Sequence, residues 1–326
     1  MIATKKLVLD ITGADSVREL EQIQSLWSGY GSIGRYQLDS TEGKTVVVKE
    51  VKAPEIKEHP RGWAGEYSHQ RKLKSYQVEL EFYKNWQKIL PSTCYTPKAL
   101  GLISGVDKGS FLFVLEDLST VGFEKNQGSG SLKEIQTCLK WLATFHATFL
   151  GEKPSGLWET GCYWHLDTRP EELEALKDLE LKAVAREIDQ LLKDATYQTI
   201  VHGDAKLANF CFSKDDSKVA AVDFQYIGGG PGVKDLVYFL GSCLSEEECE
   251  QSAEEFSEFY FYELGTKIKE HKPEIDSEAV IDEWKGLVPI AWADFHRFLK
   301  GWSPGHWKLN SYSKKIKAQV IANLGK

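Results

Sequence analysis

The sequence lacks long hydrophobic runs, paired cysteines and an excess of positive charge, and each of these absences excludes a class of protein. No apolar stretch approaches membrane-spanning length, so we expect a cytoplasmic protein with no membrane partner. The six cysteines include no C-x-x-C pair and no histidine spacing suited to zinc, which favours free thiols. A net charge of −8 without a basic stripe argues against a nucleic-acid partner.

What remains is the composition of an ordinary globular chain. Its 326 residues are enough for one or two domains, and 42% apolar residues are ample for a core. No segment is repetitive or has the composition of a disordered chain. Any indication of function therefore lies in individual polar residues and their spacing.

Two carboxylates and an amide stand at a spacing that suits phosphoryl transfer. Asp204 follows His202 and Gly203, Asn209 comes five positions after Asp204, and Asp223 comes fourteen after Asn209. Phosphoryl transfer needs one carboxylate to orient an attacking hydroxyl and accept its proton, and hard oxygen ligands to hold metal ions against the phosphates. Asp204 suits the first role, and the other two suit the second.

The residues between the two expected metal ligands predict a short β-hairpin. Residues 210–212 and 219–222 are strand-like, and residues 213–218 between them are rich in turn formers. Such a hairpin would bring Asn209 and Asp223 to the same place. The alternative is that a buried aspartate caps a helix and the asparagine serves an unrelated turn.

This constellation, His-Gly-Asp with an asparagine five residues later and then Asp-Phe-Gln, resembles small-molecule kinases related to aminoglycoside phosphotransferases and choline kinases. The ending at Gln225 looks most like the ecdysteroid kinase-like branch. The resemblance implies an α+β, bilobal, protein-kinase-like fold, with an N-lobe of antiparallel sheet plus helix over residues 1–116 and a larger, mostly helical C-lobe over 117–326. It also implies ATP and Mg²⁺ as cofactors, a small-molecule alcohol as substrate, Asp204 as catalytic base, and Asn209 and Asp223 as magnesium ligands. No obligate protein partner is evident.

A glycine-rich run near the N-terminus fits the phosphate-covering hairpin of such kinases. Gly29, Gly31 and Gly34 form a G-x-G-x-x-G pattern, in which missing side chains let backbone N–H groups approach phosphate oxygens. A dinucleotide-binding fold is the alternative, but it needs a helix opening at this run. Residues 35–38 instead read as a strand, 39–44 as a turn and 45–49 as another strand.

A lysine and a glutamate follow in the order that the kinase pattern requires. Lys49 ends a β-branched run and is the candidate for the α/β-phosphate lysine, with Lys52 as the alternative. Residues 71–86 predict the first long helix, on which Glu79 lies beside the apolar stripe. An unpaired carboxylate there would be costly, so we expect it to pair with Lys49, whereas Glu81 points elsewhere and is expected to be solvated.

The segments around these elements carry weaker expectations. Residues 53–70 form a connection without clear periodicity, which fits either a lid or a plain surface insertion. Residues 110–115 predict a buried strand that leads into the hinge between lobes. By the resemblance, adenine would bond to backbone groups of Glu116 and Leu118.

Three further residues near the motifs call for an interpretation. Lys206 stands two positions after Asp204, and we expect it to stabilise the transferring phosphoryl group; a salt bridge to Asp204 alone is the alternative. Asp235 matches a structural aspartate of the family and is expected to brace the loop at Asp204. His146 lies on an apolar helical stripe, where a hydrogen-bonded core residue is the usual case.

The identity of the acceptor substrate is the feature that the sequence determines least. An aromatic-rich loop at residues 158–165 and a C-terminal helix over 292–302 could line a pocket, although such a helical face is more often core. Rings beside Asp294 would suit a choline or ethanolamine type of substrate, and a bulky apolar alcohol would fit too. The alternative to an enzyme is a nucleotide-binding pseudokinase that regulates a protein partner. A protein kinase is disfavoured because no Ala-Pro-Glu motif follows Asp223.

Overall fold

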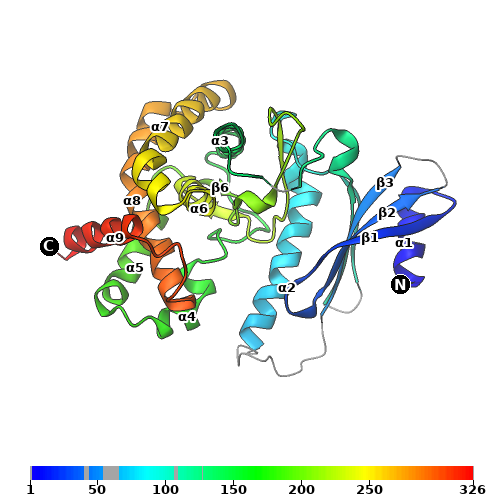
Figure 1. The fold of residues 1–326 in the computed structure, drawn as a ribbon, viewed down its shortest axis with the longest axis horizontal. Coiled ribbons are helices and arrows are strands. Elements are labelled where there is room, and N and C mark those ends of the chain that lie inside the picture. Colours follow the sequence, from blue (N-terminus) through cyan, green and yellow to red (C-terminus); the bar gives the residue numbers. More distant parts are fainter. Residues whose placement is uncertain (1, 40–43, 54–65, 106–108, 127, 326) are drawn as a thin grey trace.

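The computed structural model describes residues 2–39, 44–53, 66–105, 109–126 and 128–325. The expectation of a lid over residues 53–70 falls largely on residues outside these ranges. Figure 1 shows two lobes, with a sheet at the N-terminal end of the molecule and a mass of helices at the C-terminal end. The bilobal α+β fold expected from the sequence is confirmed.

The N-terminal lobe is built on a five-stranded sheet in the order β1-β2-β3-β5-β4, with every neighbouring pair antiparallel. Its strands are β1 (Val17–Ser25), β2 (Gly31–Leu38), β3 (Thr45–Lys52), β4 (Ala99–Ser104) and β5 (Ser110–Glu116). The β-branched run in β3 and the apolar run in β5 place these strands at the buried centre of the sheet. Strand β1 was not anticipated from the sequence.

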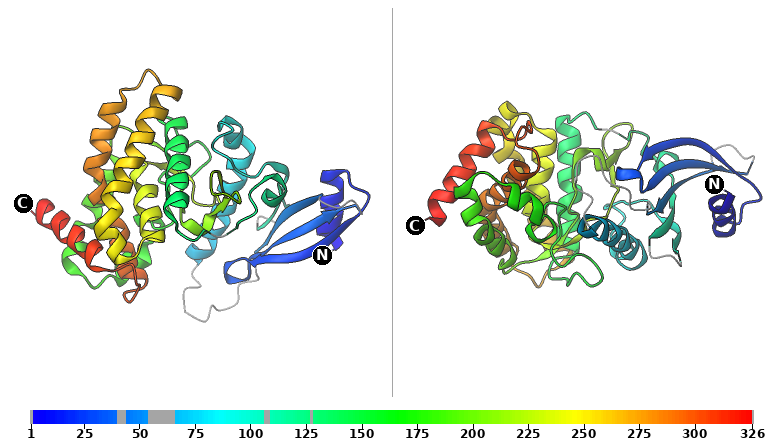
Figure 2. Two further views of the ribbon diagram at one scale, coloured as in Figure 1. Left: turned by 45° about the horizontal axis from the view of Figure 1, so that its top comes forward. Right: turned by 90° about the horizontal axis from the view of Figure 1, so that it is seen from below.

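Helices cover the two faces of this sheet differently. Helix α1 (Ile2–Thr12), also not anticipated, packs on the outer face, whereas α2 (Glu66–Glu81) lies between the sheet and the other lobe (Figures 1 and 2). The helix expected over residues 71–86 thus begins five residues earlier. It ends in a π-helical turn, Phe82–Trp86, which is followed by a 3-10 turn, Gln87–Ile89.

The C-terminal lobe consists mainly of helices, which pack around a large apolar core and a smaller one. They are α3 (Leu132–Thr148), α4 (Pro170–Ala175), α5 (Leu179–Lys193), α6 (Val233–Cys243), α7 (Glu246–His271), α8 (Ser277–Trp302) and α9 (Ser311–Leu324). A capping box at Ser131 and Glu134 begins α3, and a second one at Ser245 and Glu248 begins α7. Within the described ranges, no helix combines the length and apolarity needed to cross a membrane.

Four short strands lie where this lobe meets the sheet-bearing lobe. Strand β6 (Thr199–Val201) pairs with β9 (Gly228–Gly230), and β7 (Phe210–Phe212) pairs with β8 (Val219–Ala221), all antiparallel. The second pair is the hairpin expected between the two metal-ligand candidates, and it is confirmed. All six cysteines carry free thiols, also as expected.

Candidate active site

The loop that carries Asp204 leaves the end of β6 and is fixed from below by Asp235. One carboxylate oxygen of Asp235 accepts the backbone N–H of His202 at 2.5 Å, and the other accepts that of Gly203 at 2.9 Å. The ring Nε2 of His146 lies 3.1 Å from the same carboxylate, and all of these groups are buried. Asp235 therefore braces the loop as expected, and His146 is a hydrogen-bonded core residue.

The carboxylate of Asp204 is held by three neighbours. The Tyr238 hydroxyl donates to Oδ1 at 3.0 Å, while Lys206 Nζ and Asn209 Nδ2 lie 3.1 and 3.0 Å from Oδ2. Burial raises the pKa of Asp204, and the charge of Lys206 partly offsets that effect. The result is a fixed carboxylate that is more basic than an ordinary aspartate.

Asn209 and Asp223 meet across the β7–β8 hairpin. The backbone N–H of Val222 donates to the carbonyl of Asn209 at 3.0 Å, which places Asp223 beside Asn209. Asp223 has a positive φ of 70°, an uncommon conformation for a non-glycine residue that turns the chain sharply at this point. Although burial opposes its ionisation, Lys49, Lys206 and nearby Lys72 lower the pKa of Asp223 to about 2.

The polar atoms of this pair suit a hard divalent cation. The side-chain amide of Asn209 donates through Nδ2 to the carbonyl and the carboxylate of Asp204, at 2.8 and 3.0 Å. In the described part of the chain no donor contacts the other end of that amide, Oδ1. An amide oxygen and an ionised carboxylate at the two ends of one hairpin are ligands of the kind that Mg²⁺ prefers.

Lys49 joins the two lobes at this site. Its Nζ lies 2.6 Å from Glu79 Oε2, on α2, and 3.5 Å from Asp223 Oδ1. Burial alone would lower the pKa of Lys49, but the two carboxylates outweigh it and raise that pKa. The expected pairing of Lys49 with Glu79 is therefore present, and it extends to Asp223.

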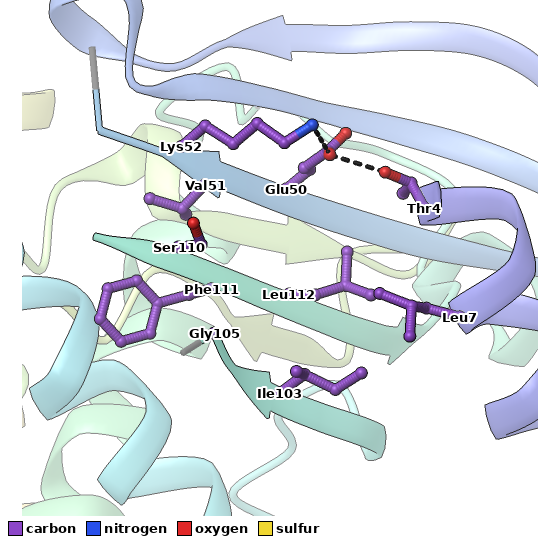
Figure 3. Close-up of a pocket in the computed structure, with 10 residues that line it drawn as sticks. All are labelled: Thr4, Leu7, Glu50, Val51, Lys52, Ile103, Gly105, Ser110, Phe111 and Leu112. Carbon is purple, nitrogen blue, oxygen red and sulfur yellow. Dashed lines mark hydrogen bonds and ion pairs between the residues drawn. The ribbon is translucent and has the colours of Figure 1, made fainter. Parts of the chain in front are cut away.

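Lys52, the alternative to Lys49, points to a different place. Its side chain is 62% exposed, and its Nζ lies 2.5 Å from Glu50 Oε1, to which Thr4 of α1 also donates at 2.6 Å. Figure 3 shows these three side chains together at a pocket between α1 and strands β3, β4 and β5. Lys52 is a solvated strand end and takes no part in the candidate site.

The glycine-rich run lies in the turn between β1 and β2 and in the start of β2. Gly29 and Gly31 have φ values of +74° and +132°, and a Cβ on Gly31 would stand 2.0 Å from the carbonyl oxygen of Glu50. Gly34 pairs with Val48 within the sheet. Strands on both sides of the run agree with a kinase-type hairpin and not with a dinucleotide-binding turn.

The expected hinge follows β5, where Glu116 ends the strand and Leu118 begins a 3-10 turn, Leu118–Val121. Asp117 between them is buried and accepts hydrogen bonds from Arg35 Nε and Thr45 Oγ1, both at 2.7 Å. Asp117 thereby connects the hinge to β2 and β3. This role of Asp117 was not predicted from the sequence. The adenine contacts of Glu116 and Leu118 stay a prediction.

Two more residues, whose roles at the site were not predicted from the sequence, extend the network around Asp223. Gln225 donates through Nε2 to Asp223 Oδ1 at 2.6 Å and accepts from Lys72 Nζ at 2.9 Å. Burial lowers the pKa of Lys72 to about 8. Lys72 precedes Glu79 by seven residues on α2, two helical turns, and that spacing would have placed both on one face.

The aromatic residues divide into core and surface. Trp158, Trp164, Trp284, Trp292, Phe295 and Phe298 are buried, whereas Trp302 and Trp307 are exposed. Asp294, considered for an ammonium ligand, is only 1% exposed and accepts two hydrogen bonds from Arg297, at 2.8 and 2.9 Å. That carboxylate is therefore part of the core.

A cluster of His165, Asp167 and Asp189 has ligand atoms within 4.8 Å of one another. Lys193 Nζ lies between the two carboxylates, 3.1 Å from Asp167 and 2.8 Å from Asp189. The ammonium group of Lys193 thus neutralises both carboxylates from the position that a metal ion would take. The cluster is an ion-pair network between α5 and residues 165–168, which lead into α4.

Comparison with known proteins agrees with the motifs. The model of the ecdysteroid kinase-like family matches residues 161–272, about a third of the chain, and this segment contains the loop at Asp204, the hairpin and Asp235. The resemblance to this branch is confirmed. No curated protein sequence matches the chain.

Several solved structures that share the fold are small-molecule kinases. Aminoglycoside 2'-phosphotransferase-IIIa, solved with GDP, has a TM-score of 0.53 and 12% identity over 99% of this chain and 98% of its own. Choline kinase LicA from Streptococcus pneumoniae has a TM-score of 0.50 and 15% identity over 99% and 98%. Amicoumacin kinase hAmiN, solved with AMP-PNP, Ca²⁺ and Ami, has a TM-score of 0.50 and 15% identity over 99% and 94%. At these identities the likeness concerns the fold.

Proposed function

We propose that this protein transfers the γ-phosphate of ATP, with Mg²⁺, to a hydroxyl group of a small molecule. The observation that carries the proposal is the meeting of Lys49, Glu79, Asp204, Asn209 and Asp223, which come from both lobes and form one connected set of contacts. Kinases that act on small molecules share the fold, and one of them was solved with an ATP analogue and a divalent cation. We place the ATP cover in residues 1–116 and the acceptor side in 117–326.

In this proposal Asp204 orients the acceptor hydroxyl and takes up its proton. The contacts from Tyr238, Lys206 and Asn209 fix the direction of the carboxylate, and its burial makes it a better base than a solvated aspartate. Because the transition state of phosphoryl transfer is loose, positioning contributes more than the strength of the base. The brace from Asp235 serves that positioning.

Asn209 Oδ1 and the carboxylate of Asp223 would hold Mg²⁺. When bound, the ion neutralises charge on the phosphates. The low pKa of Asp223 keeps that ligand ionised over the whole physiological range. Lys49, held by Glu79, would contact the α- and β-phosphates, and Gly29, Gly31 and Gly34 would cover them with backbone N–H groups.

Lys206 would meet the phosphoryl group as it is transferred. Its Nζ lies 3.1 Å from Asp204, and its side chain is 37% exposed, so it also has room to contact a ligand. Charge develops on the equatorial oxygens of the phosphoryl group in the transition state, and a cation at this position would stabilise it. The salt bridge to Asp204 alone is the alternative role, and turnover of a variant at this position separates the two.

The metal and nucleotide part of the proposal is tested by binding. Affinity for AMP-PNP is measured by calorimetry with and without Mg²⁺ for the wild-type protein, for Asp223→Asn, and for the control Asp282→Asn, which alters an exposed aspartate on α8. We expect Mg²⁺ to increase the affinity of the wild type and of the control, and Asp223→Asn to lose at least about tenfold of that increase. The same affinity with and without Mg²⁺ would remove the metal site.

A pseudokinase is distinguished by a second result on the same preparations. Mg·ATP binding without turnover on amino alcohols, aminoglycosides, sugars or sterols would favour a nucleotide-binding regulator. Turnover with one class names the acceptor. Choline and ethanolamine belong in the panel, although Asp294, the carboxylate considered for them, is held by Arg297 inside the core.

A further inference from the structure

A lysine side chain that has no role in the proposed reaction lies near Asp204. Lys308 stands in the segment between α8 and α9, and its Nζ lies 5.2 Å from the ring centre of Tyr238, whose hydroxyl binds Asp204. One tyrosine ring therefore separates this ammonium group from the expected position of the acceptor hydroxyl. The lysine is half-buried.

The ammonium group of Lys308 has aromatic neighbours but no anion. Its Nζ also lies 5.6 Å from the ring centre of Phe295 and 5.5 Å from that of Trp307. Among the residues that the structure describes, none offers it a hydrogen-bond acceptor or an ion-pair partner. Asp204, the carboxylate on the other side of Tyr238, is already paired with Lys206.

Keeping the ammonium group of Lys308 charged at this aromatic position costs free energy unless a bound ligand supplies a compensating interaction. Burial lowers the pKa of Lys308 to about 8, because ring faces replace only part of the lost hydration. The same rings cannot at once hold a quaternary ammonium, because Lys308 lies against them and would repel a second cation. An anionic group would relieve the cost.

Next to Lys308 the surface is aromatic. Trp307 and Trp302 are 59% and 42% exposed, and Trp302 stacks on Phe298 with ring centres 5.8 Å apart. Phe298 in turn contacts Tyr163, 5.3 Å away, whose ring lies 5.4 Å from Tyr238. Phe298 and Tyr238 in this series are buried, so an apolar body would lie on the exposed rings of Trp302 and Trp307, next to Lys308.

We propose that Lys308 determines acceptor specificity, and that the acceptor is a hydroxyl compound with an apolar body and an anionic group, a carboxylate or a phosphate ester, that binds Lys308. This inference rests on the proposed phosphotransferase function and names the substrate class for the same site. It predicts discrimination against choline-like and other cationic acceptors. Lys308 acts in binding, and Asp204 remains the base.

Three probes that share a chain and a terminal hydroxyl test the charge preference. They are ω-hydroxydodecanoate, which is anionic, dodecanediol, which is neutral, and amino-dodecanol, which is cationic; dodecanediol monophosphate separates phosphate from carboxylate. KM and kcat are measured by ADP release from Mg·ATP. Binding of both anionic probes, ω-hydroxydodecanoate and dodecanediol monophosphate, is measured by calorimetry with Mg·AMP-PNP present. The proteins are the wild type, Lys308→Met, Lys308→Arg and the control Lys315→Met, which alters an exposed lysine on α9.

We expect the wild type and Lys315→Met to have a KM for an anionic probe about tenfold below that for the diol, the scale of a charge-assisted contact. The ratio of the two KM values should approach one in Lys308→Met and be restored in Lys308→Arg. Equal or better use of the cationic probe, or a ratio that Lys308→Met leaves intact, would overturn the inference. So would failure of both anionic probes to bind.

The two levels of the proposal fail separately. Lys308-dependent binding of an anionic probe without any phosphorylation would support the anion-binding role of Lys308 and count against the phosphotransferase function. Phosphorylation of all probes with equal KM would support the phosphotransferase function and contradict the proposed anion-binding role of Lys308.

Discussion

Replacement of Gly203 by alanine should disrupt the loop at Asp204 more than any comparable change elsewhere. Gly203 has a φ of +80°, and a Cβ added to it would stand 2.0 Å from the carbonyl oxygen of Tyr226 and 2.8 Å from the backbone nitrogen of Cys162. The neighbouring backbone would have to move by about 1 Å to restore even 3.0 Å to the Tyr226 oxygen. Because Gly203 directly precedes Asp204, such a shift moves the expected base.

Gly151 provides a matched control for this variant. It has the same φ of +80°, but a Cβ added to it would meet nothing within 4 Å. Alanine in the left-handed region costs roughly 1 to 2 kcal/mol, part of which a less flexible unfolded chain offsets. Gly203→Ala carries that cost plus a steric term of roughly 1 to 3 kcal/mol.

Urea unfolding and turnover together decide the matter. We expect Gly151→Ala to lose about 1 kcal/mol of unfolding free energy and to keep its activity, and Gly203→Ala to lose roughly 2 to 5 kcal/mol. A base displaced by about 1 Å should cost about a hundredfold in turnover. If the two variants lost equal stability and Gly203→Ala kept full turnover, the close approach of this loop to Tyr226 would be wrong.

Three further predictions concern single charges. Lys206→Ala should reduce kcat for acceptor phosphorylation at least about tenfold with little change in the Kd of Mg·AMP-PNP, and unchanged turnover would leave only the salt bridge. Glu79→Gln should weaken nucleotide binding in calorimetry and lower the unfolding free energy by roughly 1 to 3 kcal/mol, because Lys49 keeps Asp223 as a partner; undiminished affinity would contradict the role of the pair. Glu134, whose pKa Lys125 and neighbouring serines lower to about 2 against the opposing effect of burial, should stabilise the fold above about pH 4.5 and lose that contribution as the pH falls through about 2. Urea unfolding of Glu134→Gln should thus differ from the wild type at pH 7 and converge with it in acid, and a constant difference would refute the assignment.

Local patterns in the sequence determined the elements that carry the site. The hairpin β7–β8 was predictable because two short strand-like runs flank six residues that are rich in turn formers, and this alone brought Asn209 and Asp223 together. Lys49 and Glu79 were predictable as a pair because they follow in the order of the kinase pattern and because Glu79 lies beside an apolar stripe, where an unpaired carboxylate would be costly. The brace from Asp235 followed only from the family pattern.

Contacts between distant segments were not predictable from such patterns. Tyr238 reaches Asp204 from α6 across 34 residues, and Arg35 reaches Asp117 across 82. Nothing in the local sequence specifies either pairing, because both depend on how the elements pack. The positive φ of Asp223 is likewise imposed by its surroundings, since aspartate adopts many backbone conformations.

The aromatic residues illustrate the same limit. The spacing of the rings along α8 marked one face but left open whether that face is core or a ligand surface. In the structure Phe295 and Phe298 are buried, whereas Trp302 at the end of the same helix is exposed. Lys308 drew no attention in the sequence, because its relation to Tyr238 arises only when the segment after α8 folds back onto α6.

The central claim is that Asp204 is the base of a phosphotransferase. Its most direct test is ADP release from Mg·ATP with the acceptor panel, measured on the wild type, Asp204→Asn and the control Asp282→Asn, with Mg·AMP-PNP affinity determined on the same preparations. We predict that Asp204→Asn keeps its fold and nucleotide affinity but loses about a hundredfold or more in acceptor-dependent turnover. Turnover retained by Asp204→Asn at the level of Asp282→Asn would contradict the claim.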